Sequence, residues 1–199
     1  MDIEQFKKEV SAGIIRDKYY FYKRDEKSKE LALQELSSLM NFFRQELKLY
    51  SYIFYGTLLG AVREQNFILH DNDIDIAYLS HQHNKNDVLI EHEKIKSILT
   101  KKNLLAKALK AGHIHVWGLQ QKIKIDVWTS WIGDNKLNVV PVIDNSLTKT
   151  HLIPFKAGTI KNYPFIIPNK SEEILNYLYL DWKNPRANNW RKAPWKEIL

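Results

Sequence analysis

Two aspartates spaced two positions apart carry the clearest chemical signal in this sequence. Asp73 and Asp75 alternate with isoleucines in a short apolar run. Successive side chains of a β-strand point to opposite faces, so both carboxylates should project from one face while the isoleucines turn toward a core. Neighbouring carboxylates repel each other unless a cation lies between them. Mg2+ prefers a few carboxylate oxygens plus substrate phosphates, so the pair predicts a Mg2+ site, with Mn2+ as the alternative ion.

A Gly-Thr pair ends the preceding apolar segment. Residues 52–55 are expected to form a strand, and Gly56 and Thr57 follow it directly. Thr57 suits the N-cap of a helix, glycine allows close backbone approach, and a helix N-terminus attracts phosphate oxygens. The carboxylates downstream favour a phosphate-binding turn over a plain strand-to-helix turn. Arg63, farther along this helix, either reaches a phosphate or pairs with an acid.

A third carboxylate interrupts a later alternating segment. Within residues 122–128, apolar side chains occupy one face, and Asp126 shares the other with lysines. Asp126 is either a surface carboxylate paired with Lys124 or a third acid brought beside Asp73 and Asp75 by sheet pairing. Lys124 is also a candidate substrate contact, because it would add positive charge.

The strand before this one carries two histidines. Residues 113–117 alternate, and residues 118–121 can join them to the following strand as a hairpin. His113 and His115 are interpreted as a polar pair on the sheet face, with His115 as a candidate substrate contact.

The remaining elements form a scaffold. Apolar residues recur at helical spacing over residues 27–48 and 91–110. The second helix is either continuous or broken near Asn103, and Gly112 is expected to end it. A turn is predicted at 131–136, a short strand at 137–143, an extended, loop-rich segment at 152–168, and a last helix at 171–180 capped by Ser171. We divide the chain into an N-terminal appendage (1–26), a catalytic domain (27–185) and a basic, Trp-containing tail (186–199).

Composition limits the functional classes. The 199 residues are 44% hydrophobic and include no cysteine, which excludes disulfides, thiolate nucleophiles and Cys-containing zinc sites. No signal-peptide pattern or apolar run of about 20 residues is present, so a cytoplasmic location is expected. The net charge of +7 suits anionic partners. The tail either packs on the domain or makes a peripheral membrane contact.

The motifs together resemble the LicD family, which includes bacterial phosphocholine transferases and the animal fukutin-related ribitol-phosphate transferases. Similarity is strongest over residues 56–63, 66–68 and 70–76, and weaker over 113–115, 125–128, 153–164 and 175–182. The family usually has three acids in a row after Pro-Trp; here Leu69-His70 replaces that pair and Asn72 interrupts the acids. A fukutin-type zinc region needs cysteines and is not expected.

The resemblance implies an α+β, nucleotidyltransferase-like single domain with a mixed β-sheet flanked by helices. It implies transfer of phosphocholine, ribitol phosphate or glycerol phosphate from a CDP-activated donor to a sugar hydroxyl of a glycan or glycolipid. Asp73, Asp75 and Asp126 would be the catalytic and metal-binding residues, and Gly56, Thr57 and Arg63 would contact the substrate.

Two other functions stay open at this point. The same metal site would serve an NTP-dependent nucleotidyltransferase acting on a small molecule or a protein, because one fold hosts both chemistries. The basic, Trp-rich tail would suit a non-catalytic glycan- or lipid-binding module. Nucleic acid is not expected as the main partner, because only the net charge favours it.

Overall fold

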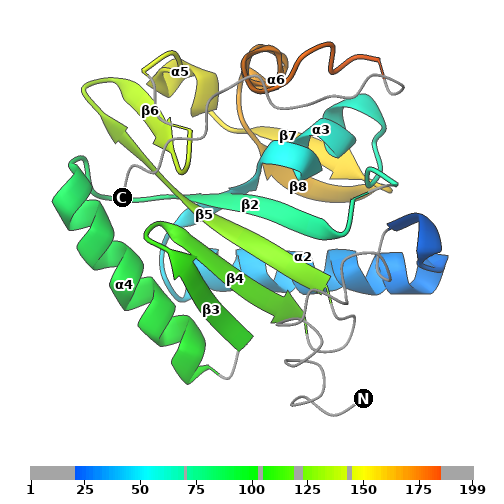
Figure 1. Ribbon diagram of the computed structural model, residues 1–199, viewed down its shortest axis with the longest axis horizontal. Helices are drawn as coiled ribbons and strands as arrows, with labels where there is room; N and C mark the ends of the chain where they lie inside the picture. The colour runs from blue at the N-terminus through cyan, green and yellow to red at the C-terminus, as the bar shows by residue number, and fades with distance from the viewer. Residues whose placement is uncertain (1–20, 70, 103–104, 119–122, 143–144, 185–199) are drawn as a thin grey trace.

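Six strands form one mixed sheet at the centre of the protein (Figure 1). The computed structural model describes the chain except for residues 1–20, 70, 103–104, 119–122, 143–144 and 185–199. The sheet has the order β1-β2-β5-β4-β3, and β6 pairs with the far end of β5. Its strands are β1 (Tyr50–Ile53), β2 (Asp73–Leu79), β3 (Leu105–Lys110), β4 (His113–Gly118), β5 (Ile123–Gly133) and β6 (Lys136–Val139). The predicted mixed sheet flanked by helices is confirmed.

Parallel pairing of β2 with β5 determines where the acidic residues meet. The register sets Asp73 beside Lys124 and Asp75 beside Asp126. The other pairings in the sheet are antiparallel, and β4 sets His115 beside Asp126 on its second side. A single row across three strands therefore carries Asp75, Asp126 and His115.

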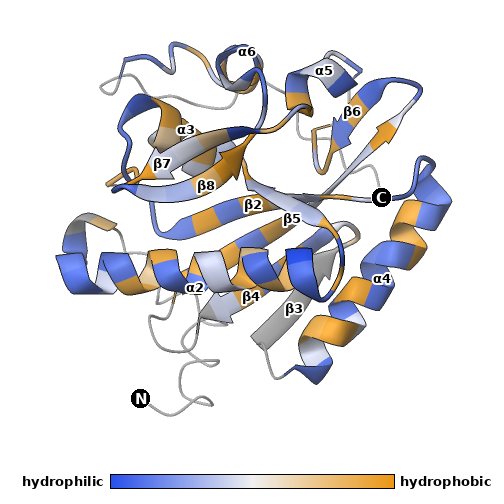
Figure 2. Ribbon diagram, turned by 180° about the vertical axis from the view of Figure 1, so that it is seen from behind, coloured by the Kyte–Doolittle hydropathy of each residue, from blue (hydrophilic) through white to orange (hydrophobic). Residues whose placement is uncertain are grey.

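One face of the sheet is closed by two long helices. Helix α2 (Glu26–Gln45) crosses in front of it when the molecule is seen from behind (Figure 2), and α4 (Lys85–Lys101) lies along the β3 side, where its His92 bonds Thr129 of β5. Ile74 and Ile76 are fully buried, as their alternation with the aspartates predicts, and Phe43 of α2 stacks on Tyr78 of β2 with ring centroids 5.6 Å apart. Helix α2 begins with Asp25 as its N-cap, so the predicted helix over 27–48 is confirmed within a few residues.

The opposite face carries shorter elements. Helix α3 (Tyr55–Arg63) packs there, with its Tyr55 ring against Trp128 of β5. A hairpin of β7 (Lys156–Ile160) and β8 (Tyr163–Ile167) follows, with α5 (Lys149–Leu152) before it and α6 (Ser171–Leu178) after it. A 3-10 turn, η1 (Phe21–Lys23), brings Phe21 onto Phe67 at 3.9 Å between ring centroids.

The helix predicted over residues 91–110 is wrong in its second half. Helix α4 ends at Lys101, and residues 105–110 form β3, which pairs antiparallel with β4. The leucines at 105 and 109 fit helical spacing, but sheet pairing overrides such a local preference. Gly112 therefore does not end a helix; it lies in the tight turn between β3 and β4, where its φ of 81° suits glycine.

Other boundaries also shift. The first strand ends at Ile53 rather than residue 55, and the turn predicted at 131–136 is confined to residues 134–135, because β5 runs on to Gly133. Residues 152–168 are extended as predicted but include a paired hairpin. Ser171 is not a cap: Lys170 is the N-cap of α6, and the Ser171 hydroxyl donates to the Pro168 carbonyl. Most of the predicted N-terminal appendage (1–26) and all of the tail (186–199) lie outside the described residues.

The length and hydropathy of the described helices bear on whether this part of the chain crosses a membrane. None of its helices combines the length and the apolar character that crossing a bilayer requires.

Candidate active site

Asp75 is fixed from three directions. Trp128 Nε1 donates to its Oδ1 at 2.9 Å, and the Gly56 amide donates to its Oδ2 at 3.1 Å. The Asp75 amide in turn donates to the Thr57 hydroxyl at 2.8 Å. The residue is only 5% exposed, so these bonds hold one carboxylate in a single orientation on the sheet face.

The Gly56-Thr57 pair lies beside Asp75, but not in the predicted way. The N-cap of α3 is Phe54, with no side-chain capping bond, so the prediction that Thr57 caps this helix is wrong. A Cβ on Gly56 would lie 2.7 Å from Asp71 Oδ2 and 3.3 Å from Asp75 Oδ2. Glycine is therefore needed for close packing of backbone against carboxylates. Contact of this pair with a phosphate stays a prediction.

Asp71 is a site residue that the sequence interpretation missed. Its carboxyl lies with those of Asp73 and Asp75, and burial, followed by the charge of Asp73, raises its pKa well above the ordinary value. Three aspartates at positions 71, 73 and 75 were a visible signal. The strand begins only at Asp73, so the alternation rule did not extend to Asp71.

Lys124 lies between two of the predicted catalytic acids. Its Nζ is 2.7 Å from Asp73 Oδ2 and 3.0 Å from Asp126 Oδ2. Burial lowers the pKa of Lys124, but the charges of Asp126 and Asp73 outweigh it and hold the pKa above its usual range. Asp126 therefore pairs with Lys124 and lies beside Asp75, but it is buried and is not the surface carboxylate of the first interpretation.

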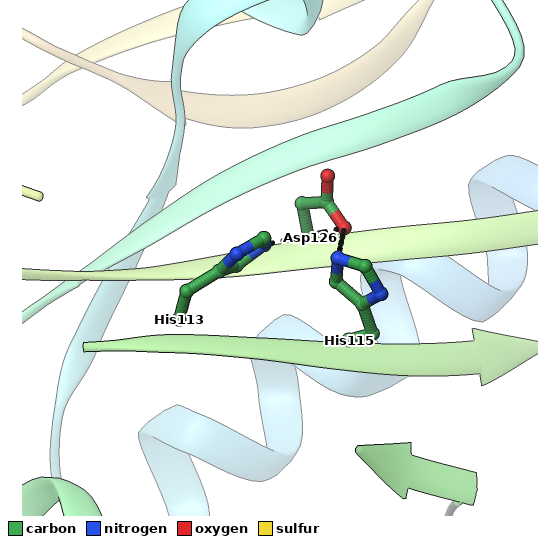
Figure 3. A group of neighbouring side chains, drawn as sticks. All are labelled: His113, His115 and Asp126. Carbon is green, nitrogen blue, oxygen red and sulfur yellow. Dashed lines mark ion pairs between the residues drawn. The ribbon is translucent and has the colours of Figure 1, made fainter. Parts of the chain in front are cut away.

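The second oxygen of Asp126 faces two histidines (Figure 3). Asp126 Oδ1 is 3.1 Å from His115 Nε2 and 3.4 Å from His113 Nε2. Each of the three residues offers one ligand atom, and these atoms all lie within 4.8 Å of one another, close enough to share a metal ion. Among the described residues, Asp126 groups with the histidines as a candidate metal ligand, not with Asp73 and Asp75.

Burial and charge set the protonation of this group. Burial alone would raise the pKa of Asp126, but His113 and the Lys124 ammonium hold it below its usual value. Burial lowers the pKa of His115 to about 4, so this imidazole is neutral near pH 7. A carboxylate with a lowered pKa is a weak proton acceptor, which favours a ligand or electrostatic role for Asp126 over that of a general base.

Arg63 makes contacts on another side of α3. Its guanidinium pairs with Glu64 at 2.5 Å and donates to the Trp182 carbonyl at 3.0 Å, and its side chain is 7% exposed. Of the two interpretations of Arg63, the structure shows the ion pair with an acid, Glu64.

Comparison with known proteins places the chain in a family. The model for LicD/FKTN/FKRP, nucleotidyltransferase domain, matches residues 49–170. The chain belongs to the LicD family. The matched span of this LicD protein begins just before β1 and includes Asp71, Asp73, Asp75 and Asp126, so all the acids of the site lie within the family domain. Membership indicates a transferase.

Wider comparisons add little to this. A solved structure, the STING-associated CdnE c-di-GMP synthase from Capnocytophaga granulosa, matches with a TM-score of 0.41 and 11% identity. The match covers 57% of this LicD protein and 37% of the synthase, so the chain spans well under half of that structure. No curated protein matches the chain.

Proposed function

We propose that this LicD protein is a metal-dependent phosphotransferase. It moves a phosphorylated alcohol (phosphocholine, ribitol phosphate or glycerol phosphate) from a CDP-activated donor to a sugar hydroxyl of a glycan or glycolipid, and it releases CMP. The observation that carries the proposal is that Asp75 and Asp126 lie side by side on adjacent parallel strands, inside a LicD domain. Phosphoryl chemistry needs positioned charge more than covalent catalysis, and a rigid row of acids supplies the anchor for that charge.

The donor set at the start of β2 fits Mg2+. Asp71, Asp73 and Asp75 offer carboxylate oxygens, the ligands that Mg2+ prefers beside substrate phosphates. Burial, followed by the charge of Asp73, raises the pKa of Asp71, and a divalent cation beside these carboxylates would favour their ionised forms. Bound there by Asp73 and Asp75, the ion would neutralise charge developing on the transferred group.

The chain's own groups would act around that centre. Trp128 and the Gly56 amide keep the Asp75 carboxylate aimed at one point, so little reorganisation is needed when the donor binds. Lys124 carries its positive charge between Asp73 and Asp126, where it is suited to contact a phosphate oxygen. His115 lies on the same face and is suited to contact the acceptor.

The test compares two products. The protein is incubated with Mg2+, a glycan acceptor, and in turn CDP-choline, CDP-ribitol, CDP-glycerol and the four NTPs, while CMP and pyrophosphate are measured. We expect CMP and a phosphodiester product from one CDP-alcohol. Asp73→Asn should abolish the reaction. Asp134→Asn is the matched control, because Asp134 is exposed in the β5–β6 turn and its φ of 48° is one that asparagine adopts readily.

A second function is favoured by the wording of the family model, which names a nucleotidyltransferase domain. In that case an NTP would yield pyrophosphate and a nucleotide-modified small molecule or protein, and no CDP-alcohol would yield CMP. That outcome overturns the first proposal. If neither product forms with any donor, a non-catalytic glycan- or lipid-binding module is favoured instead.

The cellular setting is part of the same proposal. We place the protein in the cytoplasm, with a peripheral membrane contact through the basic tail near its lipid-linked acceptor. Binding to anionic liposomes, measured with and without residues 186–199, tests this setting. Equal binding by both proteins contradicts a role for the tail.

A further inference from the structure

Two buried polar atoms on the site face lack hydrogen-bond partners. In the described residues, the buried side-chain atoms Asp126 Oδ1 and His113 Nε2 are both without one, and they face each other at 3.4 Å. The Asp126 side chain is 7% exposed and that of His113 is 10% exposed. An unsatisfied buried polar atom costs about 1–3 kcal/mol, so two at one point indicate a ligand that would bind them.

The separations match those around a metal ion. Zn2+ binds histidine nitrogen and carboxylate oxygen at about 2.0–2.2 Å, so two ligands of a tetrahedral ion lie about 3.3 Å apart. The Asp126 oxygen lies 3.1 Å from one imidazole nitrogen and 3.4 Å from the other. The side chains already converge on one point (Figure 3), which the three-ligand sets of catalytic zinc sites also do.

We propose that His113, His115 and Asp126 bind one divalent ion of the nitrogen-preferring class, of which Zn2+ is the representative. Two imidazoles and one carboxylate suit Zn2+ and its transition-metal neighbours, whereas Mg2+ prefers oxygen ligands alone. This centre is separate from the Mg2+ site of the proposed function and does not depend on the identity of the donor. Three protein ligands leave a coordination position open for a water, hydroxyl or phosphate oxygen.

Neighbouring contacts support this assignment. The two oxygens of Asp126 have different neighbours: Oδ1 faces the histidines, while Oδ2 stays paired with Lys124. The His113 ring stacks on Trp128 with centroids 3.6 Å apart, and Trp128 donates to Asp75. A hydrogen-bonded partner of a metal ligand, as Lys124 is for Asp126, holds the ligand in place and raises the affinity of a site. The contacts also connect the proposed ion to the acids on β2.

The experiment measures metal binding rather than transfer. Full-length protein is titrated with Zn2+ by calorimetry, and with Co2+ while the visible absorption is recorded, because four-coordinate Co2+ absorbs far more strongly than the hydrated ion. We expect one ion per chain, retained in a large excess of Mg2+. His113→Gln and His115→Gln should each weaken binding at least about 100-fold, more than the loss of a group that only orients a ligand.

Two controls isolate the site. His81→Ala/His83→Ala removes a His-x-His pair from an exposed loop, where these rings bond the Lys48 and Ile132 carbonyls, and it should bind Zn2+ like the wild type. Asp73→Asn should keep Zn2+ binding while losing transfer, so this inference and the proposed function fail separately. Absence of the Co2+ spectrum in wild-type protein overturns the inference without any variant. The inference is also overturned if His113→Gln and His115→Gln both bind Zn2+ as tightly as the wild type.

Discussion

Two groups of polar side chains, each containing buried histidine, lie on opposite faces of the same sheet. They differ in whether their polar atoms have hydrogen-bond partners within the chain. On the face closed by α2 and α4, the Gly112 amide donates to His92 Nε2 at 3.3 Å, and His92 Nδ1 bonds the Thr129 hydroxyl at 3.1 Å. Thr129 in turn donates to Tyr78 at 2.9 Å. On the other face, His113 Nε2 and Asp126 Oδ1 approach each other without a hydrogen bond.

Burial is similar in the two clusters, and it lowers the pKa of His92 and of His115 to about 4 alike. A perturbed pKa therefore does not by itself separate a functional histidine from a structural one. Their hydrogen bonds do distinguish His92 from the group around Asp126. Both ring nitrogens of His92 are used within the fold, which is what a structural residue requires. Asp126 Oδ1 and His113 Nε2 have no such hydrogen-bond partner, and these are two of the atoms that the proposed metal ion would bind.

Among the changes that test this comparison, the largest expected effect comes from Asp126→Asn, the change that should separate activity from stability. We expect transfer activity to fall about 100-fold or more, because this acid supplies charge at the centre of the site. The free energy of unfolding should change by less than about 1 kcal/mol, because Asp73 still pairs with Lys124. Steady-state kinetics and urea unfolding measure both quantities. A large loss of stability with normal kcat would assign Asp126 to the scaffold instead.

Gly56→Ala tests whether the site face depends on close packing. The new methyl group would meet Asp71 Oδ2 at 2.7 Å and displace the carboxylates. A displacement near 1 Å can cost about 100-fold in rate, and we expect a kcat loss of about 10- to 100-fold. Gly158→Ala is the matched control, because its Cβ would press only on the Ile167 side chain in the β7–β8 hairpin. Equal kcat losses in both variants would contradict the prediction.

Thr129→Val tests the closed face. The substitution keeps the shape of the side chain but removes the hydroxyl between His92 and Tyr78. A buried group left unsatisfied costs about 1–3 kcal/mol of stability. Urea unfolding should show this loss, while kcat and Zn2+ affinity stay at wild-type values. A fall in kcat beyond twofold, with stability unchanged, would mean that the two faces are coupled.

The last prediction is a pH dependence of stability. The folded-state pKa of His92 is about 4, below the unfolded value of about 6.5, so the unfolded chain binds more protons between those values. Stability from His92 is therefore fully present above about pH 6.5 and is lost as the pH falls toward 4. Urea unfolding across this range should show a shallower dependence for His92→Gln than for the wild type. Parallel curves would contradict the prediction.

Part of the candidate site could be predicted from short sequence patterns. Alternation in residues 73–76 predicted which side chains face the core, because the period of a strand is two. The residues around Gly56 were recognised as LicD-like, and the family domain covers them. The same kind of reasoning gave the wrong element for residues 105–110. A short apolar pattern fits a helix or a strand, and only pairing with β4 selects the strand.

By itself, the sequence determined the carboxylate pair, the family and the mixed fold, since these depend on residue type and short spacing. Tertiary structure alone decided what each polar group meets. It placed Lys124 between Asp73 and Asp126, and it put His113 and His115 on the second oxygen of Asp126. It also turned the Gly56 amide and the Thr57 hydroxyl toward Asp75. These contacts join strands distant in sequence, and strand register, which the whole sheet sets, brings them together.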